Sequence, residues 1–148
     1  MGQVKADMQG AQATGSSART PADRPLSPHL QVWRWHVTML GSILHRVSGV
    51  ALYFGAFIIA AWAISLAYGP EAYDDYMGLM GSWFGKLVLL GLTAAAFYHL
   101  ANGIRHLVWD TGRALNPKLA DMTGIAVIVF TVLATAATWW VALIADVI

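Results

Sequence analysis

Three long apolar runs without a charged residue constrain this chain more than any other feature of its sequence. They extend over residues 47–68, 87–104 and 125–145. At about 1.5 Å per residue in an α-helix, each run approaches or exceeds the length needed to cross a hydrocarbon core of about 30 Å. Only 11% of the residues are charged, against about a quarter in a typical soluble domain. The sequence therefore predicts an integral membrane protein in contact with membrane lipid.

The spanning segments are predicted to be helices. In lipid, backbone polar groups must be satisfied within the protein, and these runs lack the alternation of a β-barrel strand. We expect an all-α membrane domain over residues 29–148 with three transmembrane helices, at about 40–68, 83–110 and 122–147. Residues 69–82 are expected to form a loop between the first two. Residues 1–28, rich in Ala, Ser, Gly and Pro, are predicted to be a flexible cytoplasmic tail without a signal peptide.

The distribution of Lys and Arg predicts the orientation, because these residues are retained on the cytoplasmic side of a membrane. The loop at 69–82 carries three carboxylates and no base. Lys86 is the only base expected near the outer surface. The other bases precede the first apolar run or follow the second: Lys5, Arg19, Arg24, Arg34, Arg46, Arg105, Arg113 and Lys118. We therefore expect a multi-pass protein with a cytoplasmic amino terminus. The tail, which carries Asp7 and Asp23, is a poor transit peptide, and this favours a bacterial inner membrane.

The composition excludes cysteine-based chemistry and gives no support for nucleic-acid binding. The chain has no cysteine, so it forms no disulfide and supplies no thiolate to a metal or iron–sulfur cluster. A nucleic-acid partner is not expected. The chemistry must then lie in polar residues within the membrane, which are costly to insert and are functional candidates for that reason.

His99 is the first such candidate, because it lies about ten residues before Trp109, and so about 15 Å into the membrane. Small residues and His106 share its helix face, which leaves room for a flat ligand such as a haem. His106 lies about 10 Å nearer the cytoplasm, where propionates would be. Arg105 projects about 120° away and is expected to face another helix, headgroups or a docked protein.

Alternatives for His99 remain open at this point. It is equally a residue that hydrogen-bonds a neighbouring helix, or one member of a proton relay. A second axial ligand is missing, since His45 and His106 are expected near the interface, at a different depth from His99. If a haem binds, we expect a partner subunit to supply the other ligand.

A second polar cluster opens the first helix. Helical spacing places Ser42, His45, Arg46 and Gly49 on one face at the cytoplasmic boundary. These donors suit a quinone carbonyl beside an apolar slot for the ring and tail. The alternative is ordinary: Ser42 caps the helix, Arg46 extends to the headgroups and His45 lies at the surface.

Three segments of the chain resemble a known family: RPLSPHLQVW at 24–33, SILHRVSGV at 42–50 and YHLANGIRHLVWD at 98–110. They are similar to the cytochrome b subunit of succinate dehydrogenase, the larger membrane anchor of respiratory complex II. The resemblance runs from about Arg24 through the third helix. It implies three transmembrane helices packed against a second, smaller membrane anchor subunit, with an iron–sulfur subunit and a flavoprotein subunit completing the complex.

The resemblance also implies roles for individual residues. His99 matches the axial ligand to the iron of haem b, which is shared with the smaller anchor, and His45 and His106 match histidines near the haem propionates. Ser42 and Arg46 match the ubiquinone-binding serine and arginine. Electrons would pass from succinate, oxidised in the flavoprotein, through iron–sulfur clusters to ubiquinone, in the tricarboxylic acid cycle and respiratory chain. This chain would hold no succinate site. The rival expectations are a haem-free membrane anchor and a small transporter subunit.

Overall fold

A computed structural model of the chain describes residue 32 and residues 34–145. The contacts between residues separate a unit ending at residue 34 from a unit beginning at residue 35, and the description below concerns the second unit. The predicted tail at residues 1–28 lies outside the described residues.

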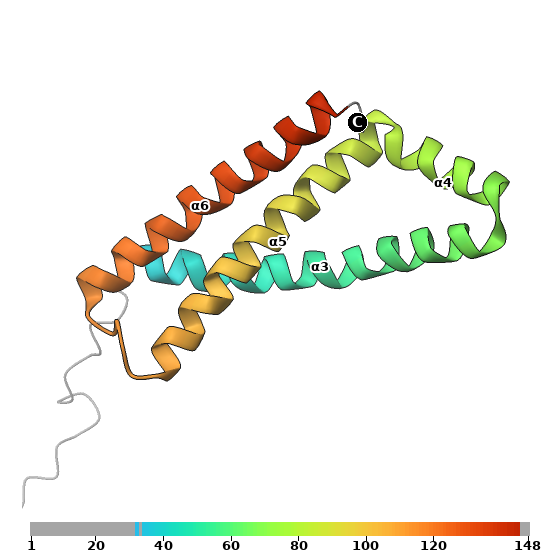
Figure 1. Cartoon of the computed structure of the whole chain (residues 1–148). Helices are drawn as coiled ribbons and strands as arrows, with labels where there is room; N and C mark the ends of the chain where they lie inside the picture. The colour runs from blue at the N-terminus through green and yellow to red at the C-terminus, as the bar shows by residue number, and fades with distance from the viewer. Residues whose placement is uncertain (1–31, 33, 146–148) are drawn as a thin grey trace, which may run out of the picture. The chain divides into compact units, whose positions relative to one another are not determined.

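Three long helices and a shorter one form the described part of this unit (Figure 1). The long helices are α3 (Val37–Tyr68), α5 (Trp83–Asp110) and α6 (Pro117–Ile144). Each contains a stretch long and apolar enough to cross a membrane, with mean hydropathies of 2.1, 1.6 and 2.2. The predicted class, all-α with three transmembrane helices, is confirmed for the described part of the chain. Helix α5 packs against both α3 and α6, and α3 also contacts α6.

The connection between the first two spans is itself largely helical, where we expected a loop. Helix α4 (Pro70–Gly81) follows α3 after a single residue, Gly69, whose φ of 112° few side chains tolerate. Pro70 suits the first position of a helix, where its missing N–H costs nothing. The chain therefore turns sharply at 69–70, and α4 lies against both α3 and α5 at one end of the bundle (Figure 1).

The caps explain the other helix boundaries. Ser82 accepts a hydrogen bond from the backbone N–H of Gly85 and caps α5. Asn116 accepts one from the backbone N–H of Lys118 and caps α6, which begins at Pro117, ahead of the apolar run. Gly112 (φ 76°) and Ala114 (φ 60°) lie between these two helices. Side-chain oxygens at such positions satisfy N–H groups that have no partner inside the helix.

Polar and small side chains lie inside the bundle and large apolar side chains lie outside. Among the described residues, the buried polar ones are Ser48, Ser65, Asn102, Arg105 and Thr135. Most large aliphatic and aromatic side chains of α3, α5 and α6 are exposed. This distribution is the reverse of a soluble core, and it suits lipid, where close packing of small residues and interhelical hydrogen bonds hold helices together.

Candidate functional site

Three imidazoles meet between α3 and α5. The rings of His45 and His99 are stacked, with centroids 4.0 Å apart and planes 11° from parallel. His106 lies against the same ring of His45, at 5.3 Å and an angle of 47°. His106 also contacts Trp109 edge-to-face at 5.2 Å. The stripe predicted from helical spacing on α5 thus faces α3, and His45 closes the cluster from the other helix.

Hydrogen bonds fix the orientation of the His99 ring. Its Nδ1 lies 3.3 Å from the backbone oxygen of His45 and 3.2 Å from Ser48 Oγ. Since a carbonyl oxygen only accepts, this arrangement favours a proton on Nδ1 and leaves the lone pair on Nε2. Among the described residues, nothing hydrogen-bonds to Nε2. A neutral imidazole whose Nδ1–H is held by a carbonyl is how proteins present a histidine to a metal.

Gly49 provides the space that the ring occupies. A Cβ on Gly49 would lie 3.1 Å from His99 Cε1 and 3.6 Å from Nδ1, so any side chain there would press on the imidazole. Within the described part of the chain, His45 Nδ1 is buried and has no hydrogen-bond partner. A buried polar nitrogen without a partner is rare and costly. An acceptor such as a carboxylate would satisfy it.

The expected difference in depth between His45 and His99 is wrong, because the two rings are in contact. The conclusion that His45 is not the second ligand of a haem held by His99 still holds, for another reason. Rings stacked at 4.0 Å leave no space for a macrocycle between them, so His45 does not face His99 across a haem. The alternative that placed His45 at the surface is also wrong, since its side chain is half-buried against α5.

Ser42 and Arg46 lie one turn apart on α3, beside this cluster. Helix α3 begins at Val37 with His36 as its N-cap, so Ser42 does not cap it and that alternative is wrong. Ser42 is half-buried and Arg46 is exposed. Among the described residues, neither has a hydrogen bond or ion pair. Both side chains are therefore available to a ligand or a partner subunit, and Arg46 also suits the headgroup region.

Arg105 is the best-buried charge of the described residues, at 7% exposed. It turns away from the histidines, as expected, and packs against α6. Its guanidinium donates to the oxygen of Ala120 at 2.7 Å, to Thr123 Oγ1 at 3.0 Å and to Asn102 Oδ1 at 3.3 Å. It also lies 4.0 Å from the centre of the Trp109 ring. These contacts bind α5 to the start of α6 and make Arg105 a structural residue.

Tyr98 joins α5 to the start of α3. Its hydroxyl donates to the backbone oxygen of Gly41 at 2.8 Å, and its side chain is buried. Gly41 precedes Ser42, and Tyr98 precedes His99, so this bond links the two predicted sites through adjacent residues. Sequence reasoning missed the contributions of Tyr98 and Ser48. A hydroxyl within an apolar span was the available signal in both cases.

Comparison with known proteins gives a family match over most of the chain. The family model for the succinate dehydrogenase/fumarate reductase transmembrane subunit matches residues 20–138. A succinate dehydrogenase cytochrome b556 subunit from Rickettsia felis is 40% identical over 116 residues, which cover 78% of this chain and 90% of the relative.

Relatives from other organisms give similar matches. The cytochrome b556 subunit from Paracoccus denitrificans is 38% identical over 106 residues, covering 72% of this chain and 82% of the relative. The mitochondrial cytochrome b560 subunit from Bos taurus is 34% identical over 124 residues, covering 80% and 72%. The family match at residues 20–138 includes α3 and α5 in full and α6 as far as residue 138.

Proposed function

Because this chain belongs to the succinate dehydrogenase/fumarate reductase transmembrane subunit family, we propose that it is the cytochrome b membrane anchor of a succinate:ubiquinone oxidoreductase. It forms part of the ubiquinone site and shares haem b with a second, smaller anchor subunit. One observation carries the haem assignment: the Nδ1 of His99 lies within hydrogen-bonding distance of the His45 oxygen and Ser48 Oγ, whereas its Nε2 has no hydrogen bond with any described residue. Succinate is oxidised in another subunit, and this chain holds no succinate site.

The residues present fit a haem. His99 would hold the iron through Nε2, and Ser48 and the His45 carbonyl would keep its ring in place and raise its basicity. His45, with an unpartnered nitrogen, and His106, in contact with it, would meet the propionates. When bound, the haem supplies a one-electron redox centre. The smaller anchor would supply the second ligand to the iron, because among the described residues the His45 ring stacks directly on His99 and cannot face it across a haem.

Ser42 and Arg46 form the part of the ubiquinone-binding site that this chain contributes, called the quinone edge below. A hydroxyl and a guanidinium can each donate to a quinone carbonyl, and the guanidinium stabilises the negative charge that develops on the oxygen during reduction. Ser42 is half-buried and Arg46 is exposed, and neither has a partner among the described residues, which supports a pocket that is completed by the smaller anchor and the iron–sulfur subunit. The flavoprotein subunit joins the complex through the iron–sulfur subunit.

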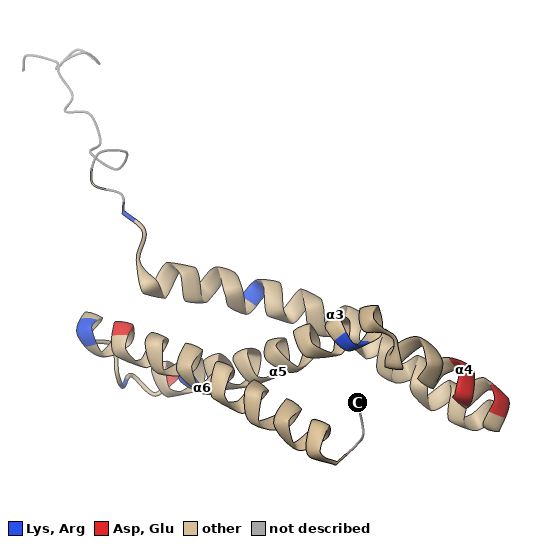
Figure 2. Ribbon diagram, turned by 90° about the horizontal axis from the view of Figure 1, so that it is seen from above, with Lys and Arg blue, Asp and Glu red and all other residues tan. Residues whose placement is uncertain are grey.

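The amino terminus lies on the cytoplasmic side of a bacterial inner membrane. The charges of the described residues support this orientation (Figure 2). Glu71, Asp74 and Asp75 lie in α4 at one end of the bundle, whereas Arg113 lies in the loop between α5 and α6 at the opposite end and Lys118 lies in the first turn of α6. Basic residues are retained on the cytoplasmic side. Both proposed sites lie toward that end, where the peripheral subunits dock.

Two substitutions in the purified complex test the assignment. His99→Ala should remove the b-type band from reduced-minus-oxidised spectra, whereas His36→Ala, outside the cluster, should keep it. An unchanged band in His99→Ala would refute the assignment of His99 as a ligand to the haem iron.

Arg46→Ala should abolish quinone reduction while succinate oxidation with an artificial acceptor continues. Arg113→Ala is the matched control, since it removes an exposed arginine from the same side of the membrane. Full quinone activity in Arg46→Ala would contradict the quinone edge.

A further inference from the structure

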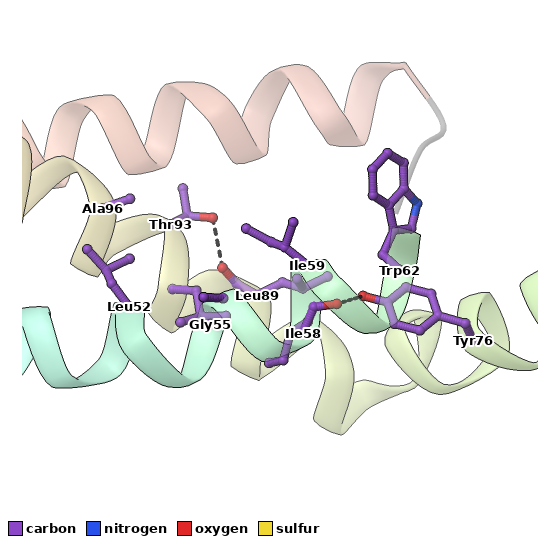
Figure 3. A pocket seen from close by; sticks show the side chains of 11 residues that line it. Leu52, Gly55, Ile58, Ile59, Trp62, Tyr76, Leu89, Thr93 and Ala96 are labelled. Atoms are coloured by element: carbon purple, nitrogen blue, oxygen red, sulfur yellow. Dashed lines mark hydrogen bonds between the residues drawn. The ribbon is translucent and has the colours of Figure 1, made fainter. Parts of the chain in front are cut away.

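An apolar cavity lies between α3, α4 and α5 (Figure 3). Because α4 forms part of its wall, it lies toward the end of the bundle remote from Arg113 and Lys118. Its volume is about 390 Å³, within the roughly 300–1,000 Å³ of typical ligand pockets. Its walls include Leu52, Ile59 and Trp62 of α3, Tyr76 of α4, and Leu92 and Ala96 of α5. Neither proposed site uses any of these residues.

Both hydroxyls in the wall of this cavity are engaged within the protein, and the indole N–H of Trp62 is the remaining side-chain donor among the lining residues. Tyr76 donates its hydroxyl hydrogen to the oxygen of Ile58 at 3.1 Å, and Thr93 donates to the oxygen of Leu89 at 2.7 Å (Figure 3). A quinone ring needs donors for its carbonyls, and these two hydroxyls are engaged within the protein. The cavity therefore suits a hydrocarbon chain better than a polar head.

The length of the cavity matches one leaflet of a bilayer. From Leu52 to Trp62 the helix rises by about 15 Å, at about 1.5 Å per residue. This is half of a hydrocarbon core of about 30 Å. Leu52 lies one helical turn beyond Ser48, which contacts His99, the residue expected deep in the membrane. We therefore infer that this end of the cavity lies near the middle of the membrane and that the Trp62 end lies at the headgroup level of the leaflet that covers α4.

A basic residue marks the headgroup end. A second cavity of about 250 Å³ shares Trp62, Tyr76 and Leu89 with the first and is also lined by Lys86. The ammonium group of Lys86 has no ion pair or hydrogen bond with any described residue, whereas its backbone N–H donates to the oxygen of Ser82. The three carboxylates of α4, Glu71, Asp74 and Asp75, are exposed and line neither cavity. An unpaired cation at the mouth of an apolar slot complements an anionic headgroup with an acyl chain.

We propose that α3, α4 and α5 form a binding site for one anionic phospholipid of this leaflet. An acyl chain occupies the cavity between Leu52 and Trp62, and Lys86 pairs with the phosphate. The site depends on membrane insertion alone and is separate from the haem and quinone assignments. Because α4 forms one wall, the lipid also fixes α4 against the two spans.

Native mass spectrometry of the purified complex, incubated with mixed micelles of phosphatidylglycerol and phosphatidylcholine, tests this site. We expect one phosphatidylglycerol to stay bound to the wild type at activation energies that strip phosphatidylcholine. Lys86→Gln should lower its occupancy at least fivefold, and Lys86→Arg should retain it. Lys118→Gln, which removes a lysine at the opposite end of the bundle, is the matched control and should bind like the wild type.

A cavity-filling pair tests the acyl chain independently of charge. Ala96→Phe places a ring in the cavity and should also lower occupancy, whereas Ala61→Phe, on α3 but outside both cavities, should not. Equal retention in Lys86→Gln and in the wild type would overturn the proposal. Retention of a quinone in place of phospholipid, lost in Ala96→Phe, would overturn it in favour of a second quinone site.

Discussion

Ser48 Oγ lies 3.2 Å from His99 Nδ1 and donates its own hydrogen to the backbone oxygen of His45, 2.9 Å away. One hydroxyl thus connects the predicted haem ligand to the turn of α3 that carries His45 and Arg46. The two residues are far apart in sequence and meet only because α3 and α5 pack together. This relationship makes Ser48 the support of His99.

Ser48→Ala should weaken haem retention without removing the b-type band. Loss of a supporting hydrogen bond to a ligating histidine typically costs about 10–100-fold in affinity. We expect haem transfer from the complex to an apoprotein acceptor to be at least about tenfold faster. Ser65→Ala is the matched control, because Ser65 is equally buried on α3 and makes the same type of bond, to the oxygen of Trp62 at 2.8 Å. Equal rates in the two variants would rule out the role of Ser48.

Gly49→Val should displace the His99 ring and abolish the b-type band. A Cβ at this position would already lie 3.1 Å from His99 Cε1, and valine adds two methyl groups. Gly91→Val makes the same change on α5, where a Cβ meets nothing within 4 Å. Absorption spectra of the two purified complexes provide the comparison. A normal band in Gly49→Val would show that the ring does not need this space.

Arg105→Met should destabilise the contact between α5 and α6. The substitution removes three hydrogen bonds and leaves Asn102, only 1% exposed, without its partner at Oδ1. A hydrogen bond to a charged group contributes about 1.5–3 kcal/mol, and transmembrane bonds average about 0.6 kcal/mol. We therefore expect a loss of about 1–3 kcal/mol in unfolding by sodium dodecyl sulfate. Arg113→Met, at an exposed position, should change the unfolding free energy by less than about 0.5 kcal/mol.

Tyr76 should make stability fall at alkaline pH. Burial raises the pKa of its phenol above the ordinary value of 10.0, because the charged form loses its hydration. The folded state therefore holds this proton more tightly than the unfolded state. The resulting stability is fully present below pH 10 and is lost as pH rises through the raised pKa. Thermal unfolding between pH 9 and pH 11.5 should show a steeper loss in the wild type than in Tyr76→Phe; parallel curves would contradict this.

Much of the fold follows from the sequence. Uncharged runs of spanning length fixed the number of transmembrane helices, because lipid forces every backbone polar group into a local hydrogen bond. The helical repeat placed His99 and His106 on one face, and the structure brings that face against α3. The same repeat placed Arg105 elsewhere, and it does pack on α6.

Contacts between residues far apart in the chain were harder to predict from the sequence. The sequence separated His45 from His99 by depth, yet their rings stack at 4.0 Å. It treated residues 69–82 as a loop, although α4 occupies most of them. Family resemblance supplied the roles of Ser42, Arg46 and the histidines, which helical spacing left open between a site and ordinary packing.

The sequence by itself determined that the chain crosses a membrane as three helices, and which residues share a helix face. Both follow from hydropathy and from the 3.6-residue repeat, which act within one segment. Only the tertiary structure decided that Ser48 and the His45 carbonyl hold His99, and that Tyr98 reaches Gly41. These contacts depend on the rotation and axial shift of one helix against another. Close packing of side chains from both helices sets these two quantities, and no periodicity within either helix records them.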